Sequence, residues 1–187
     1  MNLSQHPDAI RWNNRYQDRS QPGDAVPVLQ QNIALLPANG KALEIACGLG
    51  ANTLLLAQHG LEVDAWDISQ VAVDKLQAIA NKHGLNVHTQ ARDVVNQPPE
   101  VEQYDVIVVS FFLERSLMPA LINALKPGGI IYYQTFAREN ATSGPSNPAF
   151  RLDKNELLTC FNSLTIRVYR DDGQSAESFI VAQKPEE

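Results

Sequence analysis

The residues whose types and spacing are best suited to chemistry in this sequence are two glycines and one aspartate. Gly48 and Gly50 lie in Ala42–Asn52, where an apolar strand is expected to run into a turn and then into a helix. Glycine lets the backbone turn sharply and approach a ligand where a Cβ would fill the space. Asp67 ends the next expected strand, where a carboxylate can accept hydrogen bonds from both hydroxyls of a ribose. The pattern predicts a pocket for a nucleoside.

Carboxylates near this turn allow more than one interpretation. Glu44 lies inside the buried strand, where it is costly unless paired; its partner is either an ammonium group of the ligand or backbone donors of the glycine turn. Asp93 follows the third expected strand and either accepts a hydrogen bond from an adenine amino group or is a solvated loop residue. Asp67 itself could instead start the following helix together with Ser69. The residue types leave these alternatives open.

Aromatic and basic residues mark a second side of the expected pocket. Phe111 and Phe112 follow the fourth expected strand, and consecutive strand residues point to opposite faces, so at least one ring can line the crevice. Arg138 and Arg151 flank an irregular connection of the kind that often forms a lid or a binding loop. The two arginines either attract an anionic ligand or pair with neighbouring acidic residues at the surface.

Short apolar stretches alternate with amphipathic ones along the chain. Strands are expected at residues 41–46, 61–67, 86–89, 104–110, 129–136, 163–170 and 175–183. Helices are expected at 8–16, 26–36, 52–60, 69–84 and 153–161. This alternation predicts an α/β fold with a doubly wound, Rossmann-like sheet, mostly parallel, whose ligand crevice lies beyond the carboxyl ends of the strands.

The end of the chain departs from this alternation. Asp172 and Gly173 join the last two expected strands and favour a tight hairpin turn. An antiparallel hairpin is therefore expected to complete a seven-stranded sheet. The length predicts a single domain over residues 1–187, with an N-terminal helical cap at 1–37 and an α/β core at 38–187.

The overall composition restricts the expected partners. The net charge is −6 and no basic run offsets it, so nucleic acids and anionic membranes are disfavoured. The polar N-terminus does not resemble a secretory signal, and the longest apolar segment, Val106–Leu113, is far shorter than the ~20 residues that span a bilayer. Cys47 and Cys160 match no disulfide or metal pattern. We expect a soluble, cytoplasmic protein that acts on a small molecule and holds no metal; its oligomeric state is not predicted.

Five segments in order resemble a known family, the class I S-adenosylmethionine-dependent methyltransferases. They are Glu44–Gly50, Asp67–Ser69, Arg92–Val94, Tyr104–Ile107 and Leu125–Gly129. The resemblance covers roughly residues 12–184. Through Trp12–Tyr16 it is similar to a small bacterial branch with the tellurite-resistance and thiopurine-type enzymes.

The resemblance implies S-adenosylmethionine as the cofactor and methyl transfer to a small acceptor: an oxyanion such as tellurite, a thiol or a carboxylic acid. An elaborate catalytic dyad is then unnecessary, because the sulfonium already activates the methyl group; whether a general base is used is not predicted. One position departs from the family pattern: Ala46 stands where the first glycine of the turn is often found, and we expect a conventional backbone there. The implied cofactor-binding residues are Arg15, Tyr16, Glu44, Ala46, Cys47, Gly48, Gly50, Asn52, Asp67, Ile68, Asp93, Val94 and Ser110.

Two other classes of protein remain as alternatives. A nicotinamide-dependent oxidoreductase also pairs a glycine turn with an acidic residue, but the third glycine of its fingerprint falls on Thr53 here. A non-catalytic protein that binds S-adenosylmethionine as a sensor has the same sequence features as an enzyme. Binding and turnover measurements would separate these classes.

Overall fold

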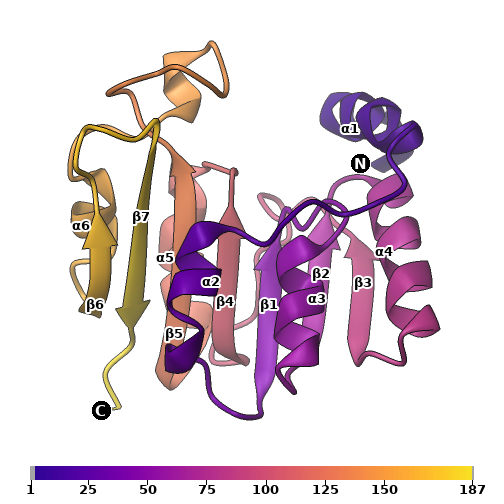
Figure 1. The fold of residues 1–187 in the computed structure, drawn as a ribbon, viewed down its shortest axis with the longest axis horizontal. Coiled ribbons are helices and arrows are strands. Elements are labelled where there is room, and N and C mark those ends of the chain that lie inside the picture. The colour runs from indigo at the N-terminus through magenta and orange to yellow at the C-terminus, as the bar shows by residue number, and fades with distance from the viewer. Residues whose placement is uncertain (1–2, 187) are drawn as a thin grey trace.

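A seven-stranded sheet runs through the middle of the computed structural model, which describes residues 3–186 (Figure 1). The strand order is β3-β2-β1-β4-β5-β7-β6. Neighbouring strands from β1 to β5 are parallel, and β7 is antiparallel to β5 and β6. The strands are β1 (Lys41–Ile45), β2 (Glu62–Asp67), β3 (Val87–Ala91), β4 (Tyr104–Ser110), β5 (Leu125–Phe136), β6 (Thr165–Arg170) and β7 (Glu177–Gln183). The predicted doubly wound sheet with a C-terminal hairpin is confirmed.

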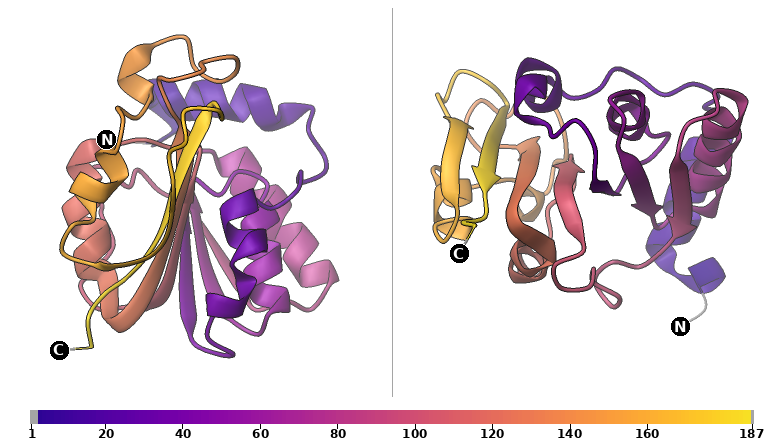
Figure 2. Two further views of the ribbon diagram at one scale, coloured as in Figure 1. Left: turned by 60° about the vertical axis from the view of Figure 1, so that its left-hand side comes forward. Right: turned by 90° about the horizontal axis from the view of Figure 1, so that it is seen from below.

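Helices cover both faces of the sheet (Figure 2). Three lie on one face: α2 (Pro27–Gln31), α3 (Ala51–Gln58) and α4 (Gln70–Lys82). Two lie on the other: α5 (Met118–Ala124) and α6 (Glu156–Cys160). The 3-10 turns are η1 (Leu3–Gln5), η2 (Ile33–Leu35), η3 (Arg115–Leu117) and η4 (Pro148–Phe150). The predicted N-terminal cap begins at residue 1; residues 1, 2 and 187 lie outside the described part of the chain.

Strand β4 shows how the sheet separates two apolar cores. Val106 and Val108 are fully buried in the core beneath α2, α3 and α4. Ile107 and Val109 are fully buried in the core beneath α5 and α6. Side chains alternate between the faces of a strand, so a strand covered on both sides must be apolar at successive positions. The continuous apolar run in this segment is therefore a consequence of its central position.

Several expected start signals are confirmed. Pro27 is the first residue of α2, where its missing N–H costs nothing. Ser69 caps α4, its Oγ accepting from the Ala72 amide at 3.2 Å. In the turn before β7, Asp172 Oδ1 accepts from the Gln174 amide at 3.0 Å, and Gly173 has a φ of +66°. Local side-chain chemistry therefore sets these boundaries.

Other boundaries differ from the prediction. The helix expected over 26–36 is broken at Asn32, whose side chain donates to the Val28 carbonyl at 2.8 Å, and continues only as η2. Helix α6 begins after Asn155, not at Asp153, because Asn155 takes a left-handed φ of 60°. Helix α5 was not predicted, and β5 begins at Leu125, four residues earlier than expected. Local features at Asn32 and Asn155 therefore decide two of these boundaries, whereas α5 depends on packing in the core.

Two segments lie beyond the carboxyl ends of the parallel strands. Helix α1 (Pro7–Gln17) lies at this edge near α4, and the loop over residues 137–152 lies at the same edge near β5 (Figure 1). Residues 92–103, which join β3 to β4, contain no helix. The fold thus places one segment at each end of this edge, on either side of the point between β1 and β4 where the strand order reverses.

Candidate functional site

The glycine turn between β1 and α3 has left-handed backbone at alternate residues. The φ values are +55° at Ala46, +54° at Gly48 and +80° at Gly50. The expectation of a conventional backbone at Ala46 is therefore wrong. A Cβ makes this conformation unfavourable, but the turn geometry imposes it because the chain must reverse between β1 and α3.

The two glycines are required for different reasons. A Cβ on Gly48 would lie 2.6 Å from the hydroxyl oxygen of Tyr16. A Cβ on Gly50 would collide with the side chain of Leu76, which is fully buried in α4. The space beside Gly50 is thus filled by helix packing and not reserved for a ligand, whereas the space beside Gly48 faces a side chain of α1.

Asp67 joins the glycine turn to the start of α4. Its Oδ2 accepts from the Gly48 amide and its Oδ1 accepts from the Ser69 amide, both at 2.8 Å. The side chain is buried, and burial raises the pKa of the carboxyl while these backbone N–H groups oppose the rise. The helix-initiating role considered from the sequence is thus present. A carboxylate has about four lone-pair sites, so both oxygens can still accept from a ribose.

Glu44 lies at the centre of a buried polar network. Its Oε1 accepts from Asn52 Nδ2 at 2.8 Å, and its Oε2 accepts from the Thr53 amide at 2.7 Å and from the Thr53 hydroxyl. Burial raises its pKa from 4.5 to about 7, although these hydrogen bonds act in the opposite direction. The donors to Glu44 thus belong to the first turn of α3, and not to the backbone of the glycine turn that the sequence suggested. Asn52 also donates to Ser110 Oγ at 3.1 Å and accepts from the Val26 amide at 2.8 Å.

Helix α1 brings an aromatic cluster over the turn. Tyr16 stacks on Trp12, with ring centroids 5.7 Å apart. Burial, together with the negative charge of Asp67, raises the pKa of the Tyr16 hydroxyl. Arg15 is exposed, and its guanidinium lies over the Trp12 ring at 5.3 Å. Tyr16 is thus the member of this cluster that reaches Gly48.

The remaining predicted cofactor residues lie around the same edge. Asp93 accepts from the Val95 amide at 3.1 Å and from Asn96 Nδ2 at 2.6 Å, so it shapes its own loop. Its pKa is lowered, because the hydrogen bonds from Asn96 and Val95 outweigh the opposing effect of burial. Cys47 and Val94 are buried, and Ile68 is half-buried. Cys47 packs in the core beneath α3 and α4.

Among the residues that the sequence suggested for the acceptor side, Phe111 stands out by its backbone. Its φ is +53° and its side chain is 45% exposed, next to Phe136 at a centroid distance of 5.0 Å. Such a conformation in a non-glycine residue is strained and is concentrated at functional sites. Phe112 is half-buried and packs against the core beneath α5 and α6. The structure therefore turns the Phe111 ring toward solvent and the Phe112 ring toward the core.

The two loop arginines have different surroundings. Arg138 pairs with Asp153 at 2.8 Å, and both side chains are about half exposed. The surface pairing considered from the sequence is thus present for Arg138. Arg151 is buried and donates to three loop carbonyls, those of Ala137 and Pro145 at 2.8 Å and that of Ser143. Arg151 therefore organises the loop backbone.

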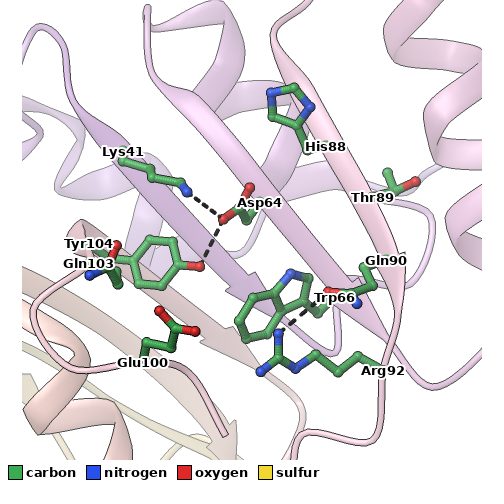
Figure 3. A pocket seen from close by; sticks show the side chains of 10 residues that line it. All are labelled: Lys41, Asp64, Trp66, His88, Thr89, Gln90, Arg92, Glu100, Gln103 and Tyr104. Atoms are coloured by element: carbon green, nitrogen blue, oxygen red, sulfur yellow. Dashed lines mark hydrogen bonds and ion pairs between the residues drawn. The ribbon is translucent and has the colours of Figure 1, made fainter. Parts of the chain in front are cut away.

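A hollow of about 400 Å³ lies elsewhere, on the sheet face left uncovered by the helix-free connection between β3 and β4 (Figure 3). Several of its polar groups are paired with one another. Asp64 Oδ2 accepts from Lys41 Nζ at 3.0 Å and from the Tyr104 hydroxyl at 2.8 Å, and Arg92 lies 3.9 Å over the Trp66 ring. Because Lys41 and Tyr104 begin their strands, this hollow extends away from the glycine turn.

Two contacts at the site were not predicted from the sequence. Asn13 Oδ1 accepts from Ser69 Oγ at 2.7 Å, and Lys75 donates to carbonyls at the end of α1. Asn13 lies in the Trp12–Tyr16 segment that contributes to the family resemblance. Lys75 could not be recognised from the sequence, because its partners are backbone carbonyls, which every residue has. Within residues 3–186, no helix is long and apolar enough to cross a membrane. No group of three or more His, Cys, Asp or Glu side chains in that range could hold a metal ion.

Comparison with known proteins identifies a family and relatives that match much of this chain. The family model of the Tellurite resistance protein TehB matches residues 14–175. The Probable S-adenosyl-L-methionine-dependent methyltransferase TehB of Haemophilus influenzae is 30% identical over 118 residues, covering 62% of this chain and 39% of that protein. The Ubiquinone biosynthesis O-methyltransferase of Coxiella burnetii is 28% identical over 116 residues, covering 59% and 48%. The matches thus span less than half the length of these curated relatives.

Solved structures share the fold at low sequence identity. The crystal structure of TehB from Haemophilus influenzae has a TM-score of 0.75 and 20% identity, and the alignment covers 92% of this chain and 67% of that one. Geranyl diphosphate C-methyltransferase from Streptomyces coelicolor, solved with S-adenosyl-L-homocysteine, has a TM-score of 0.70 and 11% identity, with 96% and 99% covered. At these identities the likeness shows the fold.

Proposed function

The chain belongs to the TehB family, and from this premise we propose that it transfers a methyl group from S-adenosylmethionine to a small-molecule acceptor. The resemblance to class I methyltransferases predicted from five motifs is confirmed by the family match and by relatives that are named methyltransferases. The expected cofactor agrees with those names.

One observation carries the proposal: the Gly48 amide and the Asp67 carboxylate meet at 2.8 Å at the carboxyl ends of β1 and β2. In an open α/β sheet, ligands bind outside these ends where the strand order reverses, which here is between β1 and β4. Ser110 ends β4 on the other side of that point and accepts from Asn52. Polar groups therefore line both sides of the switch point.

We assign the glycine turn, Asp67 and the segments around them to an adenosine group with an amino-acid tail. We assign Asp67 to the ribose hydroxyls and the loop at Asp93 to the adenine. Arg15 and Tyr16 on α1 are assigned to the methionine end, where a guanidinium suits a carboxylate. Around them we place the remaining wall, made of Glu44, Ala46, Cys47, Gly48, Asn52, Ile68, Val94 and Ser110. Gly50 shapes the turn and packs against Leu76.

The acceptor is assigned to the space between Phe111 and the loop over residues 137–152. The exposed ring of Phe111, a residue with a strained backbone, supports this placement because it offers an apolar wall beside the switch point. Arg138 is the arginine whose guanidinium is accessible to an anionic acceptor such as an oxyanion or a carboxylate. Arg151 acts indirectly by holding the loop, and Phe112 supports Phe111 from the core.

The bound cofactor would supply a methyl group that its sulfonium already activates. The chain's task is then to hold the acceptor in line and to exclude water. Helix α1 and the loop over residues 137–152 cover the two ends of the crevice, which suits them to exclude water. Glu44 and Asn52 fix the first turn of α3 and so keep the glycine turn in place.

Calorimetry and turnover assays test the proposal together. We expect micromolar binding of S-adenosylhomocysteine and no binding of NAD. Incubation with labelled S-adenosylmethionine and a panel of tellurite, thiols and small carboxylic acids should give a labelled product. Binding of NAD alone would indicate an oxidoreductase, and cofactor binding without turnover on any acceptor would favour a sensor.

A further inference from the structure

The C-terminal end of α1 is held to α4 by a single ammonium group. Lys75 Nζ lies 2.7 Å from the carbonyl oxygens of Tyr16 and Gln17 and 2.8 Å from that of Arg19. An ammonium has three N–H donors, one for each of these carbonyls. The last carbonyls of a helix lack partners within the helix, and a positive charge is favourable there. Lys75 thus supplies hydrogen-bond donors to the carbonyls at the end of α1, where Tyr16 lies.

A second attachment lies one turn earlier in α1. Asn13 Oδ1 accepts from Ser69 Oγ at 2.7 Å and from the Val71 amide at 3.2 Å. Val71 and Lys75 are four positions apart in α4, so they lie on the same face of that helix. Tyr16 therefore stands between two anchors on α4, with its hydroxyl over Gly48.

The connection after α1 can act as a hinge. Residues 19–26 contain no helix or strand, and they include Pro22 and Gly23. A Cβ placed on Gly23 would have no heavy atom within 4 Å, so the chain is loosely packed at this residue. The Tyr16 hydroxyl occupies the space next to Gly48. A ligand that approaches the Gly48 backbone from this side therefore requires α1 to move.

We propose that Lys75 is a positioning residue that latches α1 over the glycine turn and so sets how long the cofactor stays bound. The inference deepens the proposed function and rests on it. Opening the lid breaks the three ammonium contacts together, because one nitrogen makes them all. Lid motions of this kind commonly control ligand release in enzymes.

The test compares Lys75→Met, Lys75→Arg and the matched control Lys82→Met, which removes an exposed lysine from the last turn of the same helix. Hydrogen exchange of α1 in the ligand-free protein reports the latch directly. We expect about tenfold faster exchange in Lys75→Met, equal to about 1.4 kcal/mol, and a smaller change in Lys75→Arg, which keeps the charge. Lys82→Met should exchange like wild type.

Stopped-flow dissociation of S-adenosylhomocysteine gives the second readout. We expect the off-rate to rise about tenfold in Lys75→Met, with a raised KM for S-adenosylmethionine and a kcat within twofold of wild type. Exchange and off-rates within twofold of wild type would overturn the latch. Wild-type protein that binds no S-adenosylhomocysteine would instead overturn the proposed function and the cofactor role of the latch, even if α1 exchanges faster in Lys75→Met.

Discussion

The two sides of the crevice use their polar side chains differently. On the cofactor side, Asp67 and Glu44 accept hydrogen bonds from the glycine turn and from the first turns of α3 and α4. On the acceptor side, Arg151 donates to carbonyls of an irregular loop, and Arg138 pairs at the surface. Regular elements thus fix the first side, whereas the second side depends on the backbone of a loop. Under the proposed function, cofactor binding belongs to the sheet with its helices, and acceptor choice belongs to the loop.

The buried carboxylate of Glu44 gives the largest expected effect. Its pKa rises from 4.5 to about 7 on folding, mainly through burial. The folded state therefore holds this proton more tightly, so the stability that Glu44 contributes is complete below pH 4.5 and is lost as the pH rises through about 7. Between these limits, the free energy of unfolding of wild type should fall by about 3 kcal/mol relative to Glu44→Gln.

Urea unfolding at pH 4.5, 6 and 8 measures this difference. The exposed Glu100→Gln serves as the control and should follow wild type at each pH. Parallel pH profiles for wild type and Glu44→Gln would mean that the network around Asn52 and Thr53 stabilises the charged form. Glu44 would then make no pH-dependent contribution to the free energy of unfolding.

Asp67→Ala tests the cofactor side directly. The substitution removes the proposed ribose acceptor and leaves the buried Gly48 and Ser69 amides without their partner. We expect the Kd for S-adenosylhomocysteine to rise at least about a hundredfold, equal to about 2.7 kcal/mol. Calorimetry measures it, with Asp93→Ala as the matched carboxylate, for which we expect a change of less than about tenfold. An equal loss of affinity for S-adenosylhomocysteine in both variants would contradict the assignment of Asp67 to the ribose.

Arg151→Met tests the acceptor side. Three loop carbonyls lose a charged donor, so we expect a loss of about 2 kcal/mol in stability and an unchanged cofactor affinity. Arg138→Met breaks an exposed pair and should cost less than about 1 kcal/mol. Thermal unfolding and exchange across residues 137–152 measure both. A raised acceptor KM in Arg151→Met without any loss of stability would instead indicate that Arg151 contacts the acceptor directly.

Ala46→Gly should produce the smallest effect, and it is a stabilising one. Relief of the left-handed strain at Ala46 outweighs the greater flexibility of glycine in the unfolded chain. We expect a gain of about 1 kcal/mol, or about 2–4 °C in Tm. Ala78→Gly, at an exposed position inside α4, should lose a similar amount. A loss of stability in Ala46→Gly would show that the turn is not strained.

Much of the fold could be predicted because strand and helix signals are local. The buried strands, the Ser69 cap and the Asp172–Gly173 turn each follow from residues close together in the chain. Helix α5 could not be predicted, because its buried Leu121 and Ala124 pack against a sheet that only the folded chain assembles. For the same reason the role of Arg151 was not foreseen, since its acceptors are backbone carbonyls, which every residue has.

The sequence by itself determined the family and the carboxylate that ends β2, because both depend on residue types at fixed spacing. The left-handed backbone at Ala46 and the contact between Gly50 and Leu76 were decided only by the tertiary structure. The position of Tyr16 over Gly48 was decided in the same way, through the bonds of Lys75 to α1. A residue type specifies which groups are available to bond, but the distance between two helices far apart in the chain exists only after both have packed on the sheet.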